Sequence, residues 1–183
     1  MKAELILVHH PEVEPRWHGV CYGHMDARLS PAGEGKIPRL ADELAAFAPA
    51  AIFSSAASRA ATVAKALSER TGIPVRLEPR LAERGYGSWE GQTWAQIQAS
   101  DRDAMRQLFD DPEHFAPPGG ETLFAVRDRM HEWLQSLPSA EVIVAITHGG
   151  PIGALLGSLQ GKSPADWPSL VPAMGERVRV KLD

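Results

Sequence analysis

The sequence lacks the features that mark several classes of protein. It holds a single cysteine, Cys21, so no disulfide can form within the chain, and one thiol suits a reducing compartment. No window approaches the roughly 18 apolar residues that a membrane-spanning helix needs. The apolar stretch near the N-terminus is too short for a secretory signal and is interrupted by Glu4. We therefore expect a soluble, cytoplasmic protein.

Positive charge is also scarce. The chain has 19 Lys and Arg against 23 Asp and Glu, a net charge of −4, and no run of basic residues forms a local patch. This balance argues against a general nucleic-acid-binding protein. The sequence contains no internal repeat and no low-complexity tract. At 183 residues we expect one domain, 1–183, that buries its own core, without nucleic-acid or membrane partners and with its oligomeric state open.

The pattern of apolar residues predicts alternating strands and helices. Short, continuously apolar runs at 5–8, 51–53 and 142–146 are typical of strands covered on both faces, whereas 178–182 alternates like an edge strand and 75–77 is a further short strand. Apolar stripes at helical spacing predict helices from 59 to about 71, over 123–137 and over 151–159. We also expect helices over 30–47, with a kink or a late start at Pro38, and over 93–109. The order predicts an α/β fold, a three-layer α/β/α sandwich with a mostly parallel central sheet.

Polar residues cluster where the predicted strands end, which is where ligands bind in such folds. The positions concerned are His9 and His10, residues 54–59, and Thr147 with His148. Arg59 and Gly149 stand where helices begin, and helix N-termini offer unpaired amide donors and partial positive charge to an anion. Imidazoles with a guanidinium fit phosphate better than they fit a metal held by carboxylates or thiolates. The sequence thus predicts an anion site.

Six segments, in this order, resemble the histidine phosphatase superfamily, the phosphoglycerate-mutase-like proteins. They are LVHHPE, GHMDARLSPAG, SSAASRAATVA, LAERGYGSWEG, GGET and VAITHGG. The resemblance spans nearly the whole chain, and its most specific piece is L-x-E-x-x-x-G-x-W-E-G at 81–91. The short chain and the segments at 19–23 and 87–91 are most similar to the α-ribazole phosphatase-like branch.

The resemblance implies a phosphoglycerate-mutase-like fold and a metal-independent phosphomonoester hydrolase that needs no cofactor. Transferred to this sequence, it implies that His10 is the nucleophile and Glu83 the general acid and base. Arg59 and His148 would hold the phosphoryl oxygens, beside His9 and Gly149. The substrate would be a small phosphorylated metabolite, with α-ribazole 5′-phosphate suggested by the branch. Trp17 and Tyr22, in the loop after the nucleophile, are candidates to line the substrate pocket.

The chain departs from the family motif on both sides of the nucleophile. His9 stands where the family has an arginine, and Pro11 where it usually has a glycine. Replacing a permanently charged guanidinium by a mostly neutral imidazole is expected to weaken transition-state stabilisation by on the order of 2–4 kcal/mol, roughly 30- to 1000-fold in rate. Either the enzyme is slow, or His9 becomes protonated when dianionic phosphate binds, which gives an acid-shifted activity.

Other functions stay open at this point. The missing arginine also fits a degenerate phospholigand-binding protein without catalysis. His9, His10 and His148 could instead serve a metal-dependent hydrolase, and a phosphoglycerate mutase is disfavoured by the chain length. Several other residues are expected to have structural roles only: Cys21, Ser54, Ser55, Trp89, His114, Glu121 and His131, with His18 and His24 undecided.

Overall fold

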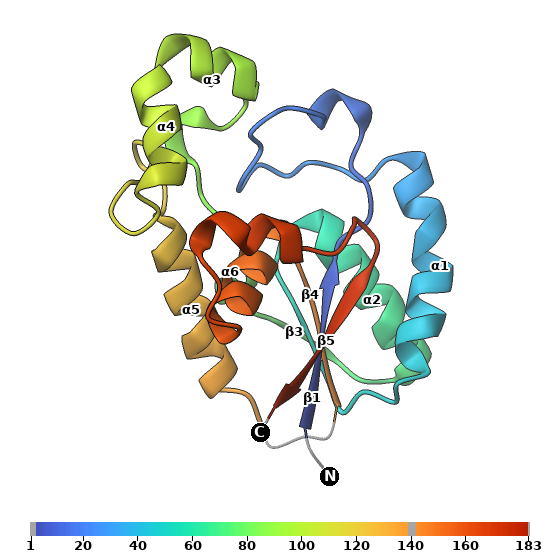
Figure 1. Ribbon diagram of the computed structural model, residues 1–183. Helices are drawn as coiled ribbons and strands as arrows, with labels where there is room; N and C mark the ends of the chain where they lie inside the picture. The colour runs from blue at the N-terminus through green and yellow to red at the C-terminus, as the bar shows by residue number, and fades with distance from the viewer. Residues whose placement is uncertain (1–2, 139–141, 183) are drawn as a thin grey trace.

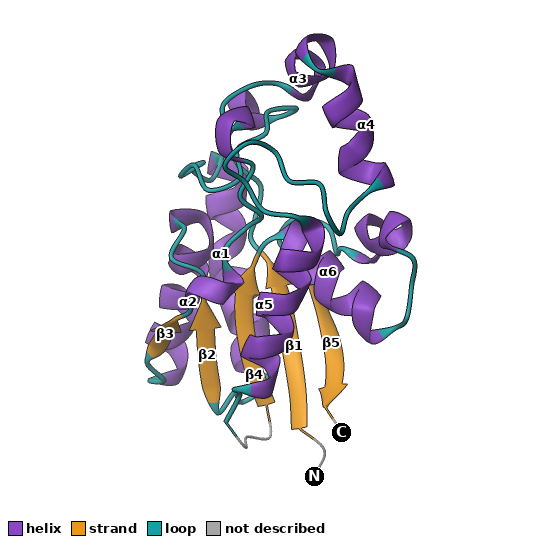
Figure 2. Ribbon diagram, turned by 90° about the vertical axis from the view of Figure 1, so that its left-hand side faces the viewer, coloured by secondary structure: helices purple, strands orange, loops and turns teal. Residues whose placement is uncertain are grey.

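The computed structural model describes residues 3–138 and 142–182 and contains a five-stranded sheet in the order β3-β2-β4-β1-β5. The strands are β1 (Ala3–His9), β2 (Ala51–Ser54), β3 (Val75–Leu77), β4 (Val142–Thr147) and β5 (Arg177–Leu182). The first four run parallel, while the edge strand β5 pairs antiparallel with β1 (Figure 2). Each predicted strand is confirmed.

Two pairs of helices cover the two faces of the sheet (Figure 1). On one face, α1 (Pro31–Ala45) and α2 (Ser58–Thr71) pack on Ile6 and Val8 of β1. On the other, α5 (Leu123–Gln135) and α6 (Gly149–Leu159) pack on Leu5 and Leu7 of the same strand. Successive side chains of a strand point to opposite faces, so a strand with helices on both faces of its sheet must be continuously apolar. The predicted three-layer α/β/α sandwich is therefore confirmed.

A small helical cap lies beyond the carboxyl ends of the parallel strands (Figures 1 and 2). It consists of α3 (Trp94–Ser100) and α4 (Arg102–Asp110), whereas the sequence predicted one helix over 93–109. The single helix was wrong because Asp101 interrupts it. The Asp101 carboxylate accepts a hydrogen bond from the Ala104 N–H at 2.9 Å, which starts a new helix with its own N-cap.

Helix α1 runs through Pro38 and does not start late. The Ser30 hydroxyl accepts from the Gly33 N–H at 2.9 Å, and Pro31 occupies the first helical position, where its missing N–H costs nothing. The interior proline removes one hydrogen bond, at a cost of about 3 kcal/mol. Burial of Ile37 and Leu40 on either side of it offsets that cost, so the late start is wrong.

Four short 3₁₀ helices complete the described fold: η1 (Pro15–Trp17), η2 (Pro79–Leu81), η3 (Gly87–Trp89) and η4 (Pro164–Leu170). Helix η4 packs directly on α6, and the Trp167 ring lies so close to Gly157 that a Cβ there would be 2.0 Å from it. Glycine at this position lets the two elements meet. Within residues 3–138 and 142–182, no helix is long and apolar enough to cross a membrane.

Candidate active site

His10 is fully buried where β1 ends, and within the described structure one of its ring nitrogens has no partner. Its Nδ1 lies 2.7 Å from the carbonyl oxygen of Pro11. A carbonyl only accepts, so Nδ1 carries the proton and Nε2 presents a lone pair. No described residue hydrogen-bonds to Nε2. Burial, with a smaller contribution from the neighbouring His9, lowers the pKa of His10 to about 3, which leaves a neutral imidazole at pH 7.

His148, at the end of β4, faces His10 with 5.1 Å between ring centroids. Its Nε2 lies 2.7 Å from the Ser55 hydroxyl, while Nδ1 is buried without a partner among the described residues. Burial holds the pKa of His148 well below its usual value. Ser55 was expected to be a turn residue, and the structure instead places its hydroxyl on this imidazole. The only sequence signal for it was its position directly after β2.

His9 lies edge-on to His10, with 4.9 Å between ring centroids. Its Nδ1 donates to the carbonyl oxygen of Pro172 at 2.9 Å, so the neutral ring presents a lone pair at Nε2. Burial lowers the pKa of His9. Gly149 lies beside this ring, because a Cβ there would be 3.6 Å from the His9 Cε1. The three predicted histidines are thus adjacent and neutral.

Arg59 lies in the first turn of α2 and is 1% exposed. Its Nη1 and Nη2 donate to the carbonyl oxygens of Met25 and Gly23 at 2.8 and 2.9 Å, and Nε is buried without a described partner. The guanidinium lies 5.1 Å from the centre of the Tyr22 ring. Trp17 makes an edge-to-face contact with Tyr22, with 6.1 Å between ring centroids. Arg59 therefore anchors the predicted pocket loop.

The Glu83 carboxylate lies against the first turn of α6. Its Oε1 accepts from the N–H groups of Arg84 and Gly150, at 2.8 and 3.1 Å. A Cβ at Gly150 would lie 2.3 Å from that oxygen, so this approach requires a glycine. The Glu83 carboxylate is therefore bound at Gly150, two positions after His148 in the chain.

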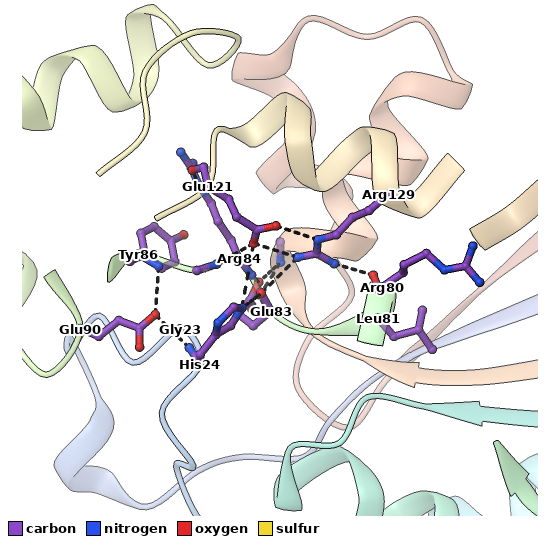
Figure 3. A network of polar contacts seen from close by, with 12 residues as sticks. Gly23, His24, Arg80, Leu81, Glu83, Arg84, Tyr86, Glu90, Glu121 and Arg129 are labelled. Carbon is purple, nitrogen blue, oxygen red and sulfur yellow. Dashed lines mark hydrogen bonds and ion pairs between the residues drawn. The ribbon is translucent and has the colours of Figure 1, made fainter. Parts of the chain in front are cut away.

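Arg129 of α5 holds the backbone around Glu83 (Figure 3). Its guanidinium donates to the carbonyl oxygens of Glu83 and Arg80 and forms an ion pair with Glu121 at 3.0 Å. The Glu121 carboxylate also accepts from the Gly85 N–H at 2.8 Å. Glu121 was expected to be a carboxylate at a helix start. The structure shows that it joins Arg129 to the segment that carries Glu83.

The remaining singled-out residues lie outside this centre or touch it only from the side. His24 is exposed and its Nε2 donates to the Glu83 carbonyl oxygen at 2.8 Å, while His18 is exposed near Glu12. Burial raises the pKa of the Cys21 thiol to about 12, as suits an unreactive residue. His114 bonds to Asp111, and His131 of α5 bonds to Ser158 of α6. Trp89 packs in a cluster with Ile97 and Leu108 of the cap helices.

Within the part of the chain that the structure describes, no group of three or more His, Cys, Asp or Glu is placed to hold a metal ion. His9 and His10 donate from Nδ1 to backbone carbonyls, and the Nε2 of His148 is engaged by Ser55.

Comparison with known proteins identifies the family. The model of the histidine phosphatase superfamily (branch 1) matches residues 5–183. The chain belongs to this superfamily. The predicted family is thereby confirmed, and the histidines, Arg59 and Glu83 all lie within the matched range.

Three relatives illustrate the range of this superfamily. Glucosyl-3-phosphoglycerate phosphatase of Mycolicibacterium vanbaalenii is 33% identical, over 97% of this chain and 83% of its own. Phosphoserine phosphatase 1 of Hydrogenobacter thermophilus is 28% identical, over 86% and 78%. The crystal structure of α-ribazole phosphatase from Shigella flexneri matches with a TM-score of 0.87 over 98% of this chain and 91% of its own, at 21% identity. This last similarity shows the fold alone.

Proposed function

We propose that this histidine phosphatase superfamily member is a metal-independent phosphomonoester hydrolase, acting as one domain over 1–183 through a phosphohistidine at His10. The observation that carries the proposal is the buried Nε2 of His10, which has no partner among the described residues. Its proton is held on the other nitrogen by the Pro11 carbonyl, so a lone pair is ready to attack. A neutral imidazole is a competent nucleophile near pH 7.

In the first step, Nε2 of His10 attacks phosphorus in line and the ester P–O bond breaks. Glu83 gives its proton to the departing oxygen, and the alcohol leaves. In the second step, Glu83 takes a proton from water, whose oxygen attacks phosphorus. The P–N bond breaks, its electron pair returns to Nε2, and inorganic phosphate is released. Splitting the transfer into two steps avoids an unaided attack by water.

Charge on the phosphoryl oxygens requires fixed donors. Arg59 supplies a permanent cation whose Nε has no partner in the described protein. Ser55 donates its hydroxyl proton to Nε2 of His148, which leaves the Nδ1–H of that ring for a phosphoryl oxygen. In this arrangement Ser55 is a positioning residue for His148.

The substrate is a small phosphorylated metabolite. The α-ribazole 5′-phosphate suggested by the sequence has support only from resemblance to its branch. The relative of higher identity acts, by its name, on glucosyl-3-phosphoglycerate, and another acts on phosphoserine. Both compounds carry a carboxylate on the phosphorylated alcohol, and α-ribazole 5′-phosphate does not. All three belong in a first substrate panel.

The proposal is tested by hydrolysis of 4-nitrophenyl phosphate in the presence of EDTA. We expect the rate to be unchanged by the chelator and by added divalent metal, because every proposed step uses side chains. Loss of activity in EDTA, restored by a metal, would support the metal-dependent alternative. Binding of inorganic phosphate without turnover of any ester in the panel would support the non-catalytic one.

His9 should make the activity acid-shifted. Its neutral ring presents a lone pair to phosphate, whereas protonation at Nε2 creates a charged donor. Since burial lowers the pKa of His9, the protonated form requires the bound dianion and grows as pH falls. We expect kcat/KM on 4-nitrophenyl phosphate to rise as pH falls from 8 to 5.5. His9→Arg should raise the value at pH 8 by about tenfold or more, since its charge is permanent.

His9→Asn is the control for this profile. It keeps a polar side chain but cannot be protonated, so only the ionisation of the substrate, near pH 6 for a phosphate monoester, should remain in its profile. A native rate that stays flat or increases from pH 5.5 to 8 would contradict a charged His9.

A further inference from the structure

A largely apolar cavity of about 610 Å³ opens beside the proposed reaction centre. It lies between the cap helices α3 and α4 on one side and α6 with η4 on the other. Its walls include Trp94, Leu108, Phe109 and Trp167. Gly149 and Gly150 also border it, and these two glycines touch His9 and Glu83 respectively. The cavity therefore borders the place where the ester bond would break.

Arg84 is the one charged residue among those that line this cavity in the described chain. Its side chain is 4% exposed, its Nε donates to the Glu121 carbonyl oxygen at 3.0 Å, and its guanidinium lies 5.3 Å from the centre of the Tyr86 ring. Nη2 is buried without a hydrogen-bond partner in the described residues. A buried guanidinium normally has an anionic or fully hydrogen-bonded partner.

The nearby carboxylates are already engaged elsewhere. Glu121 is paired with Arg129 and accepts from Gly85, and Glu83 accepts from the Arg84 and Gly150 backbone N–H groups. Neither carboxylate is within ion-pair distance of the Arg84 guanidinium. The protein thus places a guanidinium nitrogen without a partner among the described residues in the wall of an apolar cavity, and an anion on a ligand would complete it.

We propose that this cavity receives the alcohol half of the substrate and that Arg84 binds a carboxylate on it. The substrate class is then a phosphate monoester of an alcohol that has an apolar body and a carboxylate. The volume falls in the range of roughly 300–1,000 Å³ typical of pockets for small organic ligands, which exceeds what glycerate alone would fill. This assignment rests on the proposed phosphatase activity.

Two aryl phosphates of equal size test the assignment: 4-(carboxymethyl)phenyl phosphate and its neutral amide, 4-(carbamoylmethyl)phenyl phosphate. We expect the native protein to prefer the carboxylate in kcat/KM by about 10- to 100-fold, the usual range for a charge-assisted hydrogen bond. Arg84→Met should abolish this preference, and Arg84→Lys should retain part of it. Arg106→Met is the matched control, because its side chain lies on α4, is 67% exposed and carries the same charge. The control should keep the native preference.

Each outcome separates this inference from the function on which it rests. If the native protein hydrolyses neither ester, the phosphatase proposal fails. If it hydrolyses both equally, phosphatase activity stands and the role of Arg84 is overturned. If Arg84→Met lowers both rates by the same factor, Arg84 serves the phosphoryl group or the fold instead, and the inference is again overturned. Should Arg84→Met not fold, the native preference and Arg84→Lys still decide.

Discussion

Replacing His10 by alanine is expected to lower kcat on 4-nitrophenyl phosphate by on the order of 10⁴-fold or more, as loss of a covalent nucleophile does elsewhere. The neighbouring His148 is not free to take over, because its Nε2 is engaged by Ser55. The measurement is steady-state hydrolysis, together with detection of an acid-labile, base-stable phosphoenzyme after rapid quenching.

His114→Ala is the matched control for this variant. His114 is exposed and bonds only to Asp111 in the loop after α4, so its loss should leave both the rate and the phosphoenzyme intact. Since His10 is buried, the melting temperature of His10→Ala must show that the protein is folded. A folded His10→Ala that still forms a phosphoenzyme, or loses less than tenfold in kcat, would refute the covalent mechanism.

Glu83→Gln is expected to lower kcat on alkyl phosphates by about 10²- to 10⁴-fold, the range for loss of a general acid–base. Glutamine keeps an oxygen that can accept from Arg84 and Gly150, so the loop geometry is retained. The rate of the first step should fall much less on 4-nitrophenyl phosphate, because nitrophenolate leaves without protonation. The second step still lacks its base, so nitrophenol should appear in a burst of about one equivalent.

The comparison of two leaving groups is the main measurement for Glu83. Glu132→Gln makes the same charge change on the exposed side of α5 and should behave like the native protein on both substrates. An equal loss of rate on alkyl and nitrophenyl esters, without a burst, would show that Glu83 neither protonates the leaving group nor activates water.

The fold was readable from the sequence where burial is uniform along an element. A strand covered on both faces leaves a continuous apolar run, as residues 5–8 do, and helices between successive strands predict a mostly parallel sheet. The two incorrect helix predictions lie where an N-cap residue decides the helix boundary against the apolar pattern of the whole segment. Asp101 splits the cap into two helices, and Ser30 with Pro31 starts α1 early enough to run through Pro38.

Part of the candidate site could be predicted from the positions of its residues relative to the strands. His10, Arg59 and His148 follow strand ends, which converge at one edge of a parallel sheet. Ser55 and Arg84 could not be recognised, because their roles depend on partners distant in sequence. The Ser55 hydroxyl meets an imidazole 93 positions away, and Arg84 is held by the carbonyl of Glu121. No sequence pattern distinguishes a functional serine after a strand, or a functional arginine after a glutamate, from an ordinary one.

The carbonyls that orient His9 and His10 both belong to prolines, Pro172 and Pro11. A backbone acceptor survives any side-chain replacement at its own position. A survey of single substitutions would therefore report both prolines as tolerant while the tautomers of the two imidazoles stayed unchanged. Only a weaker acceptor at these peptide bonds, as an ester or thioamide provides, would expose the dependence of the chemistry on the two carbonyls.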